Sequence, residues 1–153
     1  MLSKEERKAL NTAFWEGFRK EMRKLKSANG RNINWINYPS DVKDIYIRLE
    51  ADHTGARLCF DIQPKDDSIR SILWEQLTEL RVVMEGEVGT AQWNEFDRVF
   101  QGRNVSRVSW VLEDANFYKE EDRIRIKDFL RSKLVQFDAF YQEYKEILII
   151  LAE

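Results

Sequence analysis

Four residues in the middle of the chain have the types and spacing that metal-assisted hydrolysis uses. Asp44 precedes one alternating segment, Asp61 and Gln63 lie in the next, and Lys65 follows them. Carboxylates on neighbouring strands can share Mg²⁺, which activates water for attack on a phosphate ester. This hypothesis makes Asp44 and Asp61 the metal ligands, with Gln63 or Lys65 assisting and Mg²⁺ as cofactor. The alternative needs no cofactor, because the acids then lie on a solvated sheet face and pair with arginines such as Arg48.

A second group of residues has the chemistry of phosphate binding. Six cations gather where the first helix is expected to end, and the aromatic residues Trp35 and Tyr38 follow them; the cations are Arg19, Lys20, Arg23, Lys24, Lys26 and Arg31. Cations bind nucleic-acid phosphates, and aromatic rings stack on bases. The alternative is that the cations complement the helix dipole while the aromatic rings belong to the core. The net charge of −2 limits any attraction to a local patch.

The acids lie on a segment of period two, which predicts a β-hairpin. Apolar residues occupy odd positions from Ile45 to Ala51 and even positions from Leu58 to Ile62. Opposing residues must share a face, so an odd position on the first strand pairs with an even position on the second. A turn through Asp52–Gly55 satisfies this condition. It places Leu49 opposite Leu58 and Glu50 opposite Arg57.

Helical periods occur before and after this hairpin. Ser3 and Glu6 form a capping box, and apolar residues then recur every three or four positions, which predicts a helix from about Lys4 to Ala28. A second helix is expected after Asp66, ending near Gly86.

The last helix is expected from about Lys119 and carries a heptad stripe from Leu130 to Leu151. This stripe is either the core-facing side of the helix or a homodimer seam. The core-facing side is favoured for most of the stripe. The apolar residues from Ile147 to Leu151 point to all sides of the helix, so another surface must cover them, and self-association through this end is the alternative.

Three segments complete the fold prediction. The stretch Asn32–Pro39 is either an edge strand or an ordered loop, Gly86–Asn104 is a short strand or helix, and Val105–Glu113 is a strand. We therefore expect a single α+β domain over residues 1–153. This domain consists of a long N-terminal helix, a small mainly antiparallel sheet with a central hairpin, helices on one face of the sheet, and a long C-terminal helix.

Composition excludes several classes of protein. The single cysteine, Cys59, excludes an internal disulfide, and the single histidine, His53, excludes a His-rich metal site. The N-terminal residues show no signal peptide, and the longest apolar run, Ile147–Ala152, is far shorter than the roughly 20 residues that span a bilayer. A cytoplasmic protein without membrane contact is expected.

Several segments resemble one known family. An aromatic-Asn-Tyr motif in Asn34–Tyr38 precedes a strand that ends in the acid-Ala-Asp triplet of Lys43–Asp52, and the similarity continues through Ala56–Gln63 and Trp74–Leu77. In these segments the chain resembles a bacterial family of unknown function. The resemblance implies a small stand-alone protein, or the C-terminal part of proteins with restriction-endonuclease-like regions. It implies no activity and no catalytic residues.

The expected order of elements also resembles the αβββαβ core of PD-(D/E)XK nucleases. Those enzymes place a lysine two residues after an acid, where this chain has Gln63 after Asp61. Glutamine has no charge with which to assist a metal-bound hydroxide. The missing lysine and the apolar C-terminal end favour a non-catalytic interaction or assembly domain with a protein or DNA partner. The family resemblance implies that such a domain is accessory to DNA processing or defence. A magnesium-dependent nuclease and a nucleic-acid-binding module remain the alternatives.

Overall fold

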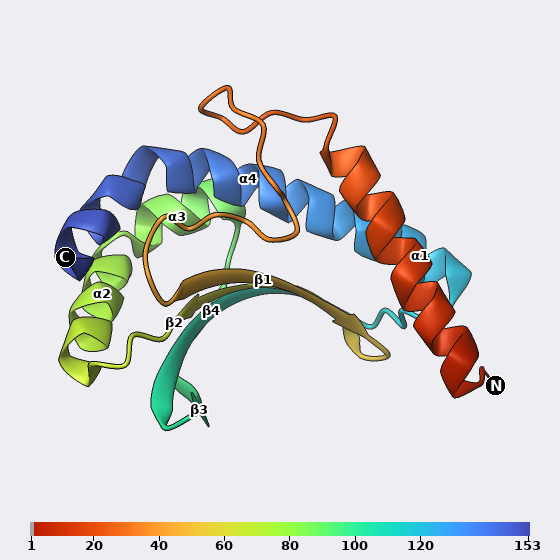
Figure 1. The fold of residues 1–153 in the computed structure, drawn as a ribbon, viewed down its shortest axis with the longest axis horizontal. Coiled ribbons are helices and arrows are strands. Elements are labelled where there is room, and N and C mark those ends of the chain that lie inside the picture. The colour runs from red at the N-terminus through yellow and green to blue at the C-terminus, as the bar shows by residue number, and fades with distance from the viewer. Residues whose placement is uncertain (1) are drawn as a thin grey trace.

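The computed structural model describes residues 2–153 and shows a curved four-stranded sheet with helices on one face (Figure 1). The elements in chain order are α1 (Lys4–Met22), β1 (Ile45–Asp52), β2 (Gly55–Ile62), α2 (Asp67–Glu79), α3 (Arg81–Val88), β3 (Gln92–Phe100), β4 (Arg103–Glu113) and α4 (Glu120–Ala152). The strands lie in the order β1-β2-β4-β3, and every neighbouring pair is antiparallel. This arrangement confirms the α+β class with long terminal helices. Within residues 2–153, no helix has the length and apolar content needed to cross a bilayer.

The predicted hairpin register is confirmed. Leu49 lies opposite Leu58, and Glu50 lies opposite Arg57. The same alternation continues into β4, where Trp110 lies opposite Leu58. One face of the three strands is therefore apolar, and the other carries the charged residues.

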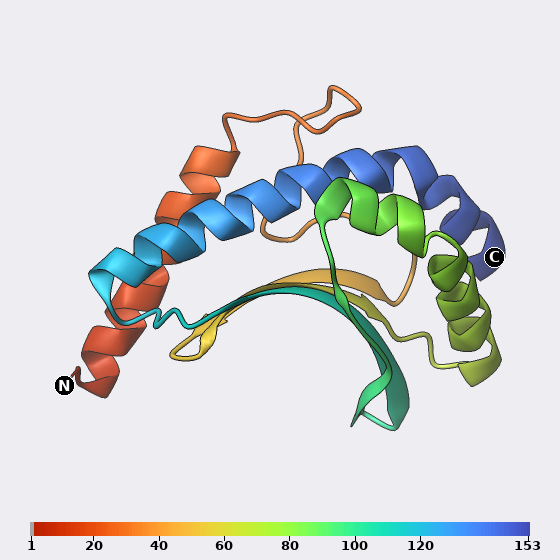
Figure 2. The same cartoon turned by 180° about the vertical axis from the view of Figure 1, so that it is seen from behind.

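The apolar face packs against α4, which runs along the sheet in both views (Figures 1 and 2). The ring of Phe137 lies 5.0 Å from that of Phe60 and 5.3 Å from that of Tyr141, measured between centroids. The heptad stripe is thus largely the core-facing side of the helix; its buried members are Leu130, Leu134, Phe137, Tyr141 and Leu148. Ile150 remains 66% exposed near the end of α4, and the homodimer through this helix stays a prediction.

The first helix is shorter than the sequence predicts, because it ends at Met22 instead of near Ala28. The capping box at Ser3 and Glu6 is present as expected. Past the helix, the Trp35 indole donates a hydrogen bond to the Leu25 carbonyl. The backbone N–H of Ala28 donates to a carboxylate of α4 instead of continuing the helical ladder. Tertiary contacts therefore end the helix before its local signal does.

The segment Asn32–Pro39 is a loop, which removes the extra strand from the predicted order of elements. The side-chain oxygen of Asn34 accepts hydrogen bonds from the N–H groups of Ile36 and Asn37, so the backbone turns there. The observed order is αββααββα, and the αβββαβ order suggested by the nuclease resemblance is wrong.

The remaining differences concern the region after β2. The predicted second helix is two helices, because the backbone at Leu80 leaves the helical range (φ −89°, ψ 2°). The open alternative for Gly86–Asn104 is decided in favour of a strand, β3, whose Trp93 ring meets that of Trp74 at 5.5 Å. The strand predicted over Val105–Glu113 is confirmed as β4.

The hairpin turn depends on Gly55, and we expect substitution there to be costly. A Cβ atom at this position would lie 2.0 Å from the Leu112 carbonyl oxygen, at a φ of +150°. We expect Gly55→Ala to lower the free energy of unfolding by about 2–4 kcal/mol, measured by urea denaturation. Gly17 is an exposed residue of α1 and has no atom within 4 Å of such a Cβ, so the control Gly17→Ala should stabilise the protein by up to about 1 kcal/mol. Equal effects of the two substitutions would contradict this account of the turn.

Candidate functional site

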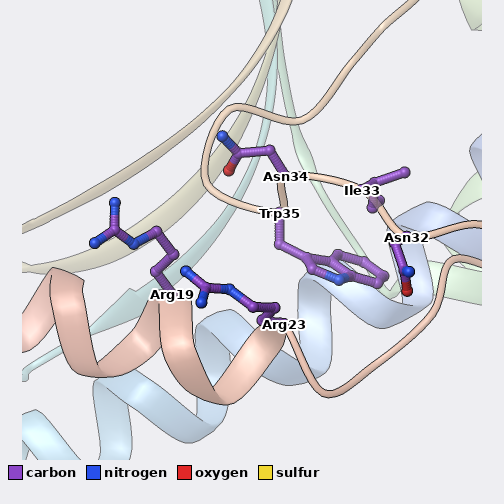
Figure 3. A pocket seen from close by; sticks show the side chains of 6 residues that line it. All are labelled: Arg19, Arg23, Asn32, Ile33, Asn34 and Trp35. Atoms are coloured by element: carbon purple, nitrogen blue, oxygen red, sulfur yellow. The ribbon is translucent and has the colours of Figure 1, made fainter.

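A hollow of about 380 Å³ lies between the C-terminal end of α1 and the loop that follows it; it is lined by Arg19, Arg23, Asn32, Ile33, Asn34 and Trp35. Figure 3 shows the two arginines on successive turns of α1, next to the loop that carries Asn34 and Trp35, with the Arg23 side chain extending toward Arg19. Residues four apart on a helix share one face. Two cations of the predicted basic run, Arg19 and Arg23, thus line one hollow together with Trp35. The other four, Lys20, Lys24, Lys26 and Arg31, are not among its lining residues.

The six cations of the predicted basic run are not neutralised by the described residues. No carboxylate oxygen in the described chain lies within 4 Å of any of the six, which are Arg19, Lys20, Arg23, Lys24, Lys26 and Arg31. The nearby acid Glu21 instead pairs with Lys127 at 2.6 Å and Arg131 at 3.5 Å. The surface at the end of α1 therefore has a local excess of positive charge, although the whole chain is slightly acidic.

The wall of the hollow is held by a buried carboxylate on α4. Asp138 Oδ1 accepts hydrogen bonds from the Tyr38 hydroxyl at 2.6 Å and from the Ser27 hydroxyl at 2.8 Å. Its Oδ2 accepts from the Ala28 N–H at 2.7 Å. Burial and the adjacent carboxylate raise the pKa of Tyr38 far above its usual value, so the phenol stays a donor. Asp138 has no cation within 4 Å in the described chain, so these neutral donors alone stabilise its charge.

The two aromatic residues of the basic segment belong to the core. Trp35 is 3% exposed and Tyr38 is 5% exposed. Trp35 presents only a small part of its ring to the hollow, and Tyr38 is not among the lining residues. The hollow therefore offers guanidinium and amide groups to a ligand but no open aromatic face for stacking.

The structure places the candidate catalytic acids on the charged face of the sheet, where arginines already bind them. Asp61 is fully buried, with Arg107 Nε at 2.7 Å from Oδ1 and Arg107 Nη2 at 2.9 Å from Oδ2. Arg48 Nη1 lies 2.6 Å from Oδ2 and 2.9 Å from the Gln63 side-chain oxygen. The cross-strand pair expected between Arg48 and Asp61 is thus present. A third arginine, Arg98, approaches Asp61 to 3.6 Å.

Asp44 and Lys65 are the remaining members of the predicted catalytic set. Asp44 has a left-handed backbone (φ 63°), and its carboxylate pairs with Arg103 at 3.1 Å. Lys65 is exposed just beyond β2. In the part of the chain that is described, no three His, Cys, Asp or Glu side chains are grouped as a metal site. The Mg²⁺ hypothesis stays a prediction, and the arginine contacts of Asp44 and Asp61 do not favour it.

Sequence reasoning missed the importance of Asp138. One signal was available, because Asp138 is a charged residue on the same helical face as Leu134 and Tyr141, where the stripe is otherwise apolar. Arg107 was also missed, because its partner Asp61 is distant in sequence and the pairing of β2 with β4 decides their contact.

The fold and the hollow together define the class of protein. It is a small α+β domain with one covered sheet face, one charged sheet face and a basic hollow beside the first helix. A family model described as Domain of unknown function (DUF4268) matches residues 10–145, so the chain belongs to that family. The match confirms the resemblance to a family of unknown function. Neither a curated protein nor a solved structure matches the chain.

The Asp61 ion pairs give a pH-dependent prediction. Burial disfavours the charged carboxylate, but the hydrogen bonds and charges of Arg107 and Arg48 outweigh it and hold the pKa of Asp61 below its ordinary value. The resulting stabilisation is complete above the unfolded-state pKa of about 3.9 and is lost as the pH falls through the lower folded-state value.

We expect Asp61→Asn to lower the free energy of unfolding at pH 7 by about 2–3 kcal/mol, less than for a fully buried pair because the Arg48 side chain is 33% exposed. The variant should also lose less stability than the wild type as the pH falls below 4. Urea denaturation at several pH values measures both effects. The control Asp114→Asn changes the same charge at an exposed residue, and an equal effect there would refute the assignment.

The buried Asp138 cluster gives a second prediction. Tyr38→Phe removes one donor from a carboxylate that has only neutral partners, and we expect a loss of about 1.5–3 kcal/mol in the free energy of unfolding. Tyr118→Phe is a matched control, because no described residue hydrogen-bonds the Tyr118 hydroxyl. Similar stability of both variants in chemical denaturation would show that the hydroxyl does not stabilise the carboxylate.

Proposed function

We propose that this domain is a non-catalytic module that binds nucleic acid through its phosphates at the basic end of α1. The observation that carries the proposal is the pair Arg19 and Arg23, which face one hollow without a carboxylate partner. Elsewhere in the molecule, arginines of the sheet such as Arg48 and Arg107 are bound to acids. Among the described residues, the cations at the end of α1 and in the loop after it therefore keep their charge available to a ligand.

The chemistry of the hollow favours a phosphate ligand. A guanidinium group can donate two parallel hydrogen bonds to phosphate oxygens, and two such groups one helical turn apart can contact one phosphate or adjacent ones. The Asn34 side chain uses its oxygen within the loop, which leaves its NH₂ group free to donate. The site therefore presents donors and positive charge, as a polyanion requires.

Burial of Trp35 and Tyr38 limits the kind of recognition that we propose. Bases cannot stack on rings that are almost entirely covered, so the contacts are to the backbone and carry little sequence information. Affinity should then depend steeply on salt. The acidic balance of the remaining surface, with a net charge of −2 overall, would orient the polymer toward α1.

This proposal agrees with the role suggested by the family resemblance. A phosphate-binding module without its own catalytic site is suited to an accessory part in bacterial DNA processing or defence, in the cytoplasm. The magnesium-dependent nuclease is the alternative proposal, and it requires Asp44 and Asp61 to exchange their arginine partners for a cation. The binding module is favoured because it requires no such rearrangement.

The test is salt-dependent binding of a fluorescent 20-base-pair DNA duplex, measured by anisotropy. If about six phosphates are contacted, the affinity should fall by roughly 10³ between 50 and 200 mM salt. The double variant Arg19→Gln/Arg23→Gln should bind more weakly, and its slope of log K against log salt should be smaller in magnitude by about 1.8.

The control is Lys4→Gln/Lys8→Gln, which removes the same charge from exposed residues at the other end of α1. Equal weakening by the control, or binding that is insensitive to salt, would contradict the proposed site. Cleavage of the same duplex in Mg²⁺, lost in folded Asp61→Asn, would support the nuclease alternative instead.

A further inference from the structure

The outer edge of β1 presents main-chain groups that no other strand uses. β1 is the first strand of the sheet, so only its inner edge is paired. The Gln63 N–H donates to the Asp44 carbonyl at 2.9 Å, which makes these two residues a hydrogen-bonded pair of the β1–β2 ladder. Hydrogen-bonded pairs then recur at every second residue. The odd-numbered residues Ile47, Leu49 and Ala51 therefore direct their N–H and C=O groups outward.

These outward groups have no partner within the described chain. The free edge begins after Ile45, whose N–H donates to the Val42 carbonyl, and its last outward-facing residue is Ala51, next to the end of β1 at Asp52. Between these two points, no hydrogen bond joins the main-chain groups of Ile47, Leu49 or Ala51 to another loop or strand. The edge thus offers alternating donors and acceptors over several residues.

A groove of about 590 Å³ runs along this edge. Its lining consists of five consecutive residues of β1, Tyr46–Glu50, and three of the preceding loop, Ile36–Tyr38. Five strand residues span about 17 Å. The preceding loop forms the other wall, so an extended segment that pairs with β1 would lie between the strand and this loop.

The opposite edge of the sheet differs in a way that makes β1 the better template. The pairing of β3 with β4 shifts between Asn94 and Arg98, as in a β-bulge. A bulge twists the edge and interrupts its hydrogen-bonding pattern. The register of β1 with β2 is continuous over all eight residues from Ile45 to Asp52.

We infer that the β1 groove binds an extended segment of a partner protein, which adds to the sheet as a fifth strand. A peptide main chain is the ligand that supplies donors and acceptors at the spacing of the free edge. Alternate side chains of the segment face Ile36 and the half-buried Leu49 and are apolar. The others lie beside Tyr46, Arg48 and Glu50 and are polar. This site is separate from the basic hollow and does not depend on the proposed function.

The test uses a capped heptapeptide of alternating threonine and valine that ends in lysine. Two isomers of it carry N-methyl groups, one on the valines and one on the threonines. Only every second residue of an added strand donates to β1, so one isomer should bind at least about tenfold more weakly than the other. Titration of the ¹⁵N-labelled protein should shift the amide signals of Ile47, Leu49 and Ala51. Absence of these shifts at millimolar peptide, or equal behaviour of the two isomers, would overturn the inference.

Two variants locate the peptide. Ile36→Arg places a long charged side chain in the groove and should abolish binding, whereas Val99→Arg makes the same change at a 70% exposed residue of β3 and should not. If Val99→Arg abolished binding and Ile36→Arg did not, the peptide would lie at the β3 edge of the sheet, and the inference would be wrong. A dimer in sedimentation that Ile36→Arg disrupts would assign the groove to a second copy of the chain and would also overturn the inference.

Discussion

The alternation of side chains along β1, β2 and β4 is the constraint on which the rest of the molecule depends. One face of these strands is apolar and is covered by α4 through contacts such as Phe60 with Phe137. Within residues 2–153 no helix covers the opposite face, as both views show (Figures 1 and 2). Buried acids on that face must therefore be neutralised from within the sheet. Asp61 is fully buried under the guanidinium groups of Arg48 and Arg107, because these residues occupy the same face of the two adjacent strands.

The loop from residue 23 to residue 44 connects this constraint with both proposed sites. Asn32–Trp35 form part of the wall of the basic hollow, and Ile36–Tyr38 form a wall of the groove beside β1. The loop crosses α4 in Figure 1, where Asp138 accepts hydrogen bonds from Ser27, Ala28 and Tyr38. One buried carboxylate thus fixes the position of two surfaces. A loop of this length is ordinarily mobile, so such anchoring is needed if both surfaces are to keep their shapes.

The distribution of ion pairs separates the binding surfaces from the charged face of the sheet. Charges on the sheet neutralise one another, and a ligand that binds there must break contacts as short as 2.6 Å. Cations on α1 have no such partners, since Glu21 is held by Lys127. The number of charged residues does not distinguish the charged face of the sheet from the end of α1. An anion can bind where the cations are not already paired with carboxylates.

Periodicity and turn chemistry in the sequence by themselves determined the hairpin register, the capped first helix and the core-facing stripe of the last helix. The capped helix and the helical stripe follow from contacts between residues near one another in the chain. The hairpin register follows from the alternation of side chains, because only the pairing of odd with even positions keeps the apolar residues on one face. Tertiary structure alone decided the end of α1, the contact of Asp61 with Arg107, and the partners of Asp138. Each of those outcomes depends on residues far apart in sequence, such as Tyr38 with Asp138 and Asp61 with Arg107. Such contacts form only when packing has brought the segments together, and no local pattern encodes them.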